Sequence, residues 1–266
     1  SAIMLSALNL RGKTKIIEKR NTRDHTERLM RYLEIDFKKK ILNKNSTSIE
    51  LNGPYEIKPR DIIVASDPSS AAFFIVGALI IPESAISLKN IALNKSRIAF
   101  IDVLKKMGGK IRVKKTKTIS GEDVGEIHAS YSLLNAIKIK ASKSPYLIDE
   151  YPILSIAASQ AKGITVMKGL SELRHKESDR IKSIVTNLSK VGFKVTSNKD
   201  DISIEGSNKI QIINQKKIKT YGDHRIAMSF VILSLLYENK LIIDDESCIS
   251  ISYPDFKKHL KKLSTH

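Results

Sequence analysis

The sequence of 266 residues lacks tryptophan, has one cysteine and contains only 6% aromatic residues. The single cysteine, Cys248, cannot form an internal disulfide, which excludes the disulfide-rich secreted class and indicates a reducing compartment. The longest apolar runs, such as residues 71–81, are shorter than a membrane-spanning helix requires. The first residues show no secretory-signal pattern. We therefore expect a cytoplasmic protein without a membrane partner.

Acidic residues are also scarce, because 28 aspartates and glutamates face 46 lysines and arginines, which gives a net charge of +18. Such a charge is typical of proteins whose partners are polyanions, namely nucleic acids, membrane surfaces or phosphorylated metabolites. Few aromatic side chains are present on which bases could stack. We interpret most of the lysines as solvated surface and do not expect nucleic acid as the partner.

An internal repeat organises the chain, and its clearest copy begins at Asp67. Asp67 is followed by proline, a good start for an apolar helix. Residues 85–93 then alternate like a strand, and an amphipathic helix ends at Gly109. Another strand begins at Lys110. This copy predicts a helix, strand, helix and hairpin.

The same order recurs along the chain, with copies that start near Ser1, Asp149 and Asp223. Short strand-like segments over residues 202–206 and 209–213 complete the units. About three and a half copies of the module are present. Alternating helices and strands of this kind predict an α/β fold of packed layers.

The starts of the repeated helices carry the first functional signal. Free backbone N–H groups and the positive end of the helix dipole make such starts natural anion sites. The second helices also carry an arginine near their starts, at Arg23, Arg97 and Arg180. If the units pack around a shared axis, these features could converge on a cleft suited to a small ligand with several negative charges.

Three titratable residues stand near these helix starts. Asp149 precedes an apolar helix, Glu177 lies between Lys176 and Arg180, and His224 is next to an arginine. The ordinary interpretation is that Asp149 caps its helix, Glu177 makes a surface ion pair and His224 is structural. The alternative is proton transfer, because burial and neighbouring cations tune the pKa of such groups. The residues alone leave both possibilities open.

Four segments together resemble the 5-enolpyruvylshikimate-3-phosphate (EPSP) synthase family. They are TRDHTERLM (residues 22–30), DPSSAAFF (67–74), LRHKESDRI (173–181) and YGDHRIAMSF (221–230). The order and spacing of the four segments fit the family, as do their residues. The resemblance covers essentially the whole chain and corresponds to about the C-terminal three-fifths of the family's chain, so we expect upstream sequence to be missing.

The resemblance implies an enolpyruvyl transferase architecture of two similar domains, each built from three βαβαββ units whose helix starts face a cleft. In this chain the architecture would be present only in part. Residues 1–65 would be the remaining part of one domain, and residues 66–266 would be most of the other.

The resemblance also implies a reaction, 3-phosphoshikimate 1-carboxyvinyl transfer. The enolpyruvyl group passes from phosphoenolpyruvate to the 5-hydroxyl of shikimate 3-phosphate, with release of phosphate, in the shikimate pathway of aromatic amino-acid biosynthesis. No cofactor and no metal are expected. A chain of full length would be a monomer.

By motif position, the resemblance assigns chemistry to three residues. Asp149 would be the base at the reacting hydroxyl, Glu177 would handle the proton at the methylene carbon, and Lys176 would bind the substrate. Six further residues would bind substrates: Ser1, Ala2 and Arg23 at the phosphate of shikimate 3-phosphate, and Arg180, His224 and Arg225 at phosphoenolpyruvate.

Three departures from the family pattern qualify this interpretation. The family usually has glutamine where this chain has Ile3, and some members carry a lysine where this chain has Ile251 and Ser252. The family's N-terminal Lys-Ser and glycine-rich segments, which supply further cations, are absent. We therefore expect the chain alone to be inactive.

Three alternatives remain. A related enolpyruvyl transferase acts on a UDP-amino sugar, but the KESDR and DHR segments favour the shikimate enzyme, and Cys248 is in the wrong context for its reactive cysteine. A basic RNA-binding or RNA-end-processing module of similar repeat fold is the second, although no nucleotide-binding glycine loop supports it. A noncatalytic anion-binding remnant is the third.

Overall fold

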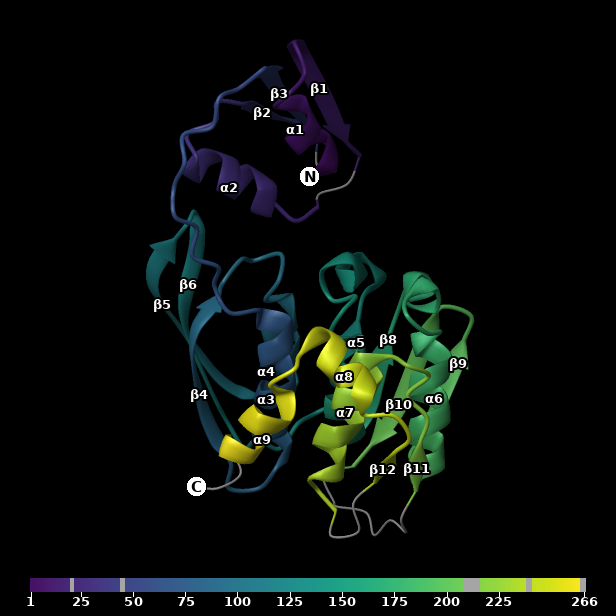
Figure 1. The fold of residues 1–266 in the computed structure, drawn as a ribbon. Coiled ribbons are helices and arrows are strands. Elements are labelled where there is room, and N and C mark those ends of the chain that lie inside the picture. Colours follow the sequence, from purple (N-terminus) through teal and green to yellow (C-terminus); the bar gives the residue numbers. More distant parts are fainter. Residues whose placement is uncertain (20–21, 44–45, 208–215, 238–240, 264–266) are drawn as a thin grey trace.

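The computed structural model describes residues 1–19, 22–43, 46–207, 216–237 and 241–263. Within these ranges, no helix is long and apolar enough to cross a membrane. The described residues form a small body that contains the N-terminus and a larger body that contains the C-terminal helices (Figure 1).

The small body is a three-stranded antiparallel sheet with two helices (Figure 1). The strand order is β1-β3-β2, and the central strand buries Ile49 and Leu51. Met4 from the first helix and Met30 from the second complete a core of its own. The elements are α1 (Ala2–Ala7), β1 (Gly12–Glu18), α2 (His25–Tyr32), β2 (Lys38–Asn43) and β3 (Ser46–Gly53).

The larger body begins with the unit predicted from Asp67. The side chain of Asp67 accepts a hydrogen bond from the backbone N–H of Ser70 and caps the first helix, and Pro68 occupies its first turn. The strands pair antiparallel in the order β4-β6-β5. The elements are α3 (Pro68–Ile80), β4 (Ala85–Ala92), α4 (Ala99–Lys106), β5 (Lys110–Ile119) and β6 (Glu122–Ser130).

Two more groups of elements complete the larger body. Counting the unit from Asp67 as the first, the second group has a sheet with the strand order β7-β8-β10-β9. The third group has a two-stranded sheet of β11 and β12. The second comprises β7 (Lys138–Ile139), the 3-10 helix η1 (Ala141–Tyr146), α5 (Tyr151–Ser159), β8 (Gly163–Met167), the 3-10 helix η2 (Ser171–His175), α6 (Arg180–Val191), β9 (Lys194–Asn198) and β10 (Asp201–Gly206). The third comprises β11 (Lys217–Ile218), α7 (His224–Ser234), β12 (Ile242–Ile243), α8 (Ser247–Ser252) and α9 (Phe256–Leu263).

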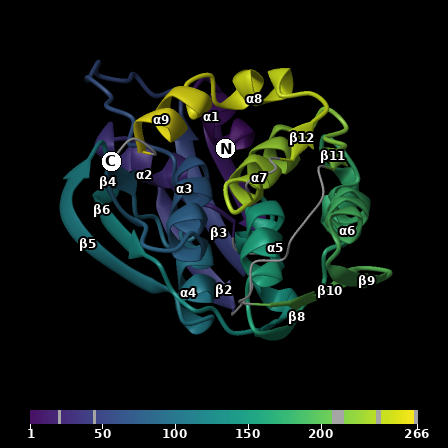
Figure 2. The same ribbon diagram turned by 90° about the horizontal axis from the view of Figure 1, so that it is seen from below.

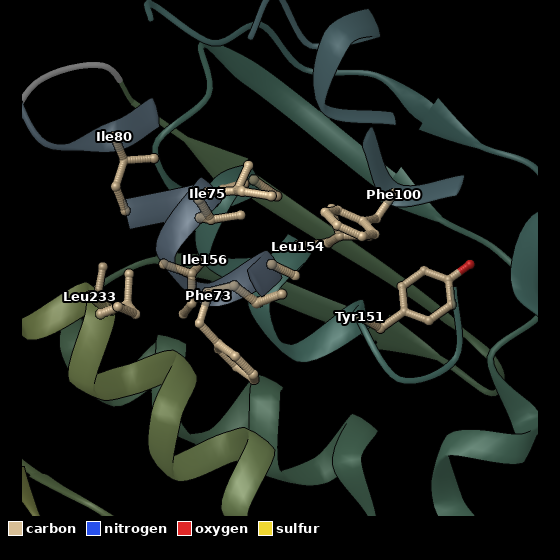
Figure 3. Packing of buried hydrophobic residues seen from close by; sticks show 14 of the residues in the cluster. Phe73, Ile75, Ile80, Phe100, Tyr151, Leu154, Ile156 and Leu233 are labelled. Atoms are coloured by element: carbon tan, nitrogen blue, oxygen red, sulfur yellow. The ribbon is translucent and has the colours of Figure 1, made fainter. Parts of the chain in front are cut away.

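Three apolar helices, α3, α5 and α7, form the centre of the larger body and pack against one another (Figure 2). Helix α5 buries all nine of its residues, and α3 buries every residue except Ser70. Figure 3 shows Phe73 and Ile75 of α3 near Leu154 and Ile156 of α5 in this core. A helix that is apolar all round has to be enclosed, so the sheets and the amphipathic helices α4 and α6 lie outside.

The predicted α/β fold is confirmed, and within the described ranges the predicted helices and strands occur in their expected order. The last unit differs from the expectation, because its strand shortens to Ile242–Ile243. The strand expected over residues 209–213 lies outside the described residues. The two bodies have separate hydrophobic clusters, one over residues 4–51 and one from residue 71 onward. The boundary near residue 65 stays a prediction.

Candidate active site

The starts of α3, α5 and α7 meet at one end of the larger body. Ser69 on α3 donates a hydrogen bond to Oε1 of Glu150, which directly precedes α5. Arg225 on α7 donates from Nη1 to the backbone oxygen of Asp149 at 3.1 Å. Because helix starts present free N–H groups and positive dipole ends, their meeting makes this end suited to anions. The structure thus brings together three of the helix starts identified in the sequence.

Arg180, the first residue of α6, is fully buried, with 1% of its side chain exposed. Its Nε donates to Oδ2 of Asp223 at 2.8 Å, and its Nη2 donates to Oε2 of Glu177 at 2.5 Å. Asp223 is also buried, and it caps α7 by accepting from the backbone N–H of Arg225. A buried guanidinium is tolerated only with such partners, because removing it from water is costly.

The third nitrogen of Arg180 is different. Its Nη1 is buried, has no hydrogen-bond partner among the described residues, and lies 3.9 Å from Oδ1 of Asp149. Buried donors in native proteins nearly always have a partner, so an unpaired one calls for an explanation. A guanidinium N–H beside three helix starts is a donor that an anionic ligand can use.

Asp149 connects the two bodies. Its Oδ2 accepts a hydrogen bond at 2.8 Å from Nη2 of Arg23, which lies in the small body. Burial raises the pKa of Asp149, but the hydrogen bond from Arg23 and the charges of Arg225, Arg23 and Arg180 outweigh it, so the pKa lies below its ordinary value. Asp149 is therefore an ionised carboxylate at neutral pH, able to accept a hydrogen bond from a ligand hydroxyl. It does not cap α5, where Glu150 occupies the N-cap position.

His224 opens α7 beside these arginines. Burial and the charge of Arg225 lower its pKa, and the opposing charges of Asp223 and Glu177 do not compensate. His224 is therefore neutral at neutral pH and adds no positive charge to the cluster. It can still donate or accept one hydrogen bond at each ring nitrogen.

Lys176 and Glu177 stand at the exposed edge of the cluster. Nζ of Lys176 lies 3.0 Å from Oε1 of Glu172, one turn earlier in the chain. The side chain of Glu177 is 49% exposed and is held by Arg180. Glu177 thus pairs with the buried Arg180, whereas Lys176 pairs with Glu172 at the surface.

Ser1 and Ala2 lie in the small body, away from Arg180. The hydroxyl of Ser1 is 2.5 Å from that of Thr26 on α2, so Ser1 stands next to the segment that carries Arg23. Ala2 is the first residue of α1 and is exposed. Ile3, which replaces the glutamine usual in the family pattern, has 60% of its surface exposed.

In the described ranges, no group of three or more His, Cys, Asp or Glu residues is arranged to hold a metal ion. A cavity of about 940 Å³ separates part of the small body from the larger one. Its lining includes Asp24 and Asn94 but not Asp149, Arg180 or Arg225, so the arginine cluster does not line this cavity.

The model of the EPSP synthase (3-phosphoshikimate 1-carboxyvinyltransferase) family matches residues 1–260. The chain belongs to this family. It is 40% identical over 263 residues to the 3-phosphoshikimate 1-carboxyvinyltransferase of Petrotoga mobilis, and 40% identical over 264 residues to that of Persephonella marina. Each alignment covers 99% of this chain and 60% of the relative. The chain thus spans about 60% of the length of these curated relatives.

Solved structures agree with the family assignment. EPSP synthase from Acinetobacter baumannii superposes with a TM-score of 0.90 at 36% identity, covering 99% of this chain and 59% of that one. The enolpyruvyl transferase NikO from Streptomyces tendae has a TM-score of 0.75 at 16% identity over a similar share, which supports the fold alone. The chain therefore has the α/β enolpyruvyl transferase fold.

In this member of the EPSP synthase family, two buried acidic residues next to the cluster were not predicted as site residues from the sequence. Asp223 was predicted only as the start of a helix, although it is the main partner of Arg180. Glu150 was not predicted to have any role in the site, although only 2% of its surface is exposed. An aspartate before an apolar helix was the available signal for Asp223. For Glu150 no signal was available, because its partner Ser69 is 81 residues away.

Glu150 provides a prediction about pH. Burial raises the pKa of Glu150, despite the opposing hydrogen bond from Ser69 and the charge of Arg225. At pH values between the pKa of Glu150 in the unfolded chain and its higher pKa in the folded chain, the folded state binds more protons than the unfolded state. The free energy of unfolding contributed by Glu150 therefore falls as pH rises. A Glu150→Gln variant lacks this loss. We expect its free energy of unfolding, relative to the parent, to increase as pH is raised from about 5 to about 8.

Urea unfolding at several pH values measures this difference. Glu205→Gln is the matched control, because Glu205 is exposed on β10. A difference between parent and Glu150→Gln that stays constant across the pH range would contradict the prediction.

Proposed function

We propose that the whole protein transfers the enolpyruvyl group of phosphoenolpyruvate to the 5-hydroxyl of shikimate 3-phosphate and releases inorganic phosphate. The observation that carries the proposal is the arginine cluster in a chain of this family. Arg180 is buried with one donor unpaired, beside an ionised Asp149 that also contacts Arg23. Two anionic reactants repel each other, and fixed cations offset this repulsion without reorganisation.

The cluster accounts for the binding of phosphoenolpyruvate. Arg180 and Arg225 would hold its carboxylate and phosphate, since guanidinium groups match both geometries. Neutral His224 would line the same site. Binding of an anion at Nη1 of Arg180 would satisfy the donor that has no partner among the described residues.

Shikimate 3-phosphate would bind between the bodies. Arg23, together with Ser1 and Ala2 at the start of α1, would hold its phosphate, and Lys176 would leave Glu172 to contact the same substrate. Asp149 would accept hydrogen bonds from the ring hydroxyls. Arg23 now contacts Asp149, so we expect its guanidinium to turn toward the phosphate when substrate binds.

The addition step needs two proton transfers, and the elimination step returns both protons. Asp149 would take the proton of the 5-hydroxyl as the hydroxyl oxygen attacks carbon 2 of phosphoenolpyruvate. Glu177 would supply a proton to the methylene carbon. The tetrahedral product would then lose phosphate, which would take up the proton held by Asp149. The methyl carbon would return a proton to Glu177 as the carbon–carbon double bond forms again. Positioned acid and base groups of this kind typically contribute factors of about 10² to 10⁴ each.

Several finer expectations remain predictions beside this proposal. They are the correspondence to the family's C-terminal part, the domain limits 1–65 and 66–266, the inactivity of this chain alone, the monomeric state and the cytoplasmic location. The family match does not favour an RNA-binding module. A noncatalytic remnant would bind the substrates without turnover.

Phosphate release tests the proposal. The whole protein is mixed with phosphoenolpyruvate and shikimate 3-phosphate, and the same assay is run with shikimate in place of its phosphate. We expect turnover only when both substrates are present. Tight binding of both without phosphate release would refute the transferase activity.

A further inference from the structure

Four consecutive residues at the start of α2 each make a side-chain hydrogen bond to a partner outside that helix. The partners of residues 23, 24, 25 and 26 are, in order, Asp149, Asn94, Glu122 and Ser1. Three of these partners belong to the larger body. The start of α2 is therefore a junction between the two bodies, and it carries the residue proposed to hold the substrate phosphate.

Asn94 is a rigid anchor at this junction. It is buried, with 3% of its surface exposed, and its Nδ2 donates to Oδ1 of Asp24 at 2.7 Å. Its Oδ1 accepts from both the backbone N–H and the hydroxyl of Ser96, at 2.9 and 2.7 Å. With both ends of the amide engaged, the side chain has one orientation, and it fixes the position of Asp24.

Glu122, the first residue of β6, is the second anchor. Its Oε1 lies 2.5 Å from Nδ1 of His25, and its Oε2 lies 3.7 Å from Nε of Arg28. The amide of Asn94 is 3.4 Å from the same Oε2. Only 18% of the side chain is exposed, so solvent screens these contacts less than those of a surface pair.

The tip of the β5–β6 hairpin brings Glu122 to α2 (Figure 1). Gly121 has a φ of +83°, and a Cβ atom there would lie 2.7 Å from the backbone oxygen of Arg28. Only glycine permits this approach. Ser120 accepts a hydrogen bond from the backbone N–H of Ile63, so the hairpin also contacts the segment between the bodies.

We propose that Asn94 and Glu122 are positioning residues, which hold the start of α2 so that Arg23 faces the phosphate of shikimate 3-phosphate. The inference rests on the proposed function. Asp24, Arg28 and Asn94 line the cavity of about 940 Å³ between the bodies. Where the side chains of Asp24 and Arg28 face this cavity, their polar contacts with Asn94 and Glu122 fix their positions.

Kinetics of the whole protein test the proposal. We expect Asn94→Ala and Glu122→Ala each to raise the KM for shikimate 3-phosphate about tenfold, the effect of roughly one lost hydrogen bond to a charged group. The KM for phosphoenolpyruvate should stay unchanged, and kcat should fall less than about threefold. Glu122→Gln keeps an oxygen acceptor for His25 and should restore most of the affinity.

Glu126→Ala is the matched control, because Glu126 lies on the same strand and its side chain is 3.7 Å from His128, away from α2. It should leave both KM values unchanged. A lower melting temperature with unchanged KM values in Asn94→Ala and Glu122→Ala would overturn the proposal, because that pattern belongs to a merely structural role.

A distance measurement separates this proposal from the proposed function. Spin labels at Lys15→Cys in the small body and Lys194→Cys in the larger one report the distance between the bodies, since the natural Cys248 is buried. We expect the double variant that carries both Asn94→Ala and Glu122→Ala to show a broader distribution of distances between the two labels. If the unaltered protein releases no phosphate, the proposed function fails. A distribution that stays unchanged would then overturn the positioning role as well, and a broadened one would support it.

Discussion

Replacing Arg180 with methionine is expected to abolish measurable phosphate release by the whole protein and to lower its free energy of unfolding by about 3–5 kcal/mol. Methionine fills much of the space but leaves Asp223 buried without its cation. An uncompensated buried carboxylate is costly, and Asp223 also caps α7. The variant removes the unpaired Nη1 donor as well, so the binding of phosphoenolpyruvate should be lost together with the stability.

Urea unfolding and the phosphate-release assay measure these two effects. Arg174→Met is the matched control, because Arg174 lies in the same motif but is 33% exposed in its pair with Asp179. We expect it to cost at most about 1 kcal/mol, as exposed pairs do. An Arg180→Met variant that unfolds like the parent would show that Asp223 is compensated in another way.

Replacing Asp149 with asparagine is expected to lower kcat by a factor of about 10² to 10⁴. It should also lower the free energy of unfolding near neutral pH, because the variant lacks the stabilising charge of the carboxylate. The amide oxygen can still accept the hydrogen bond from Arg23, so the local geometry should persist. The amide cannot take up the proton of the reacting hydroxyl. Steady-state kinetics with both substrates measure the loss, and Asp255→Asn, on the exposed surface before α9, is the control.

The stabilities of the parent and Asp149→Asn should converge in acid. Because the pKa of Asp149 is lowered in the folded state, its ionised form stabilises the fold above the ordinary pKa of about 3.8, and this contribution is lost as pH falls through the folded value. The parent should therefore lose more stability than Asp149→Asn below about pH 4. Activity of Asp149→Asn close to that of the parent would exclude Asp149 as the base.

Local features of the fold could be predicted from the sequence because they depend on neighbours along the chain. Asp67 followed by Pro68 predicted the start of α3, and the cap is present as expected. The alternation over residues 85–93 predicted β4. Capping and periodicity act over a few residues, so one sequence is sufficient to detect them.

The partners within the site could not be predicted in this way. Arg23 meets Asp149 across 126 residues, and Arg180 meets Asp223 across 43. Such pairs depend on how the repeated units pack, which no local pattern specifies. The sequence identified the residue types and the helix starts, whereas the structure shows which carboxylate faces which guanidinium.

The outer strands of two sheets carry a consequence for how the molecule behaves in a crowded solution. Strand β5 ends the order β4-β6-β5, and strand β2 ends the order β1-β3-β2. An outer strand has unpaired backbone groups that can recruit a strand from another molecule, and lysine opposes this by charge repulsion. The lysines on these two strands are Lys38, Lys39, Lys40, Lys110, Lys114, Lys115 and Lys117. Part of the excess positive charge therefore protects the protein against sheet-to-sheet aggregation, independently of any ligand.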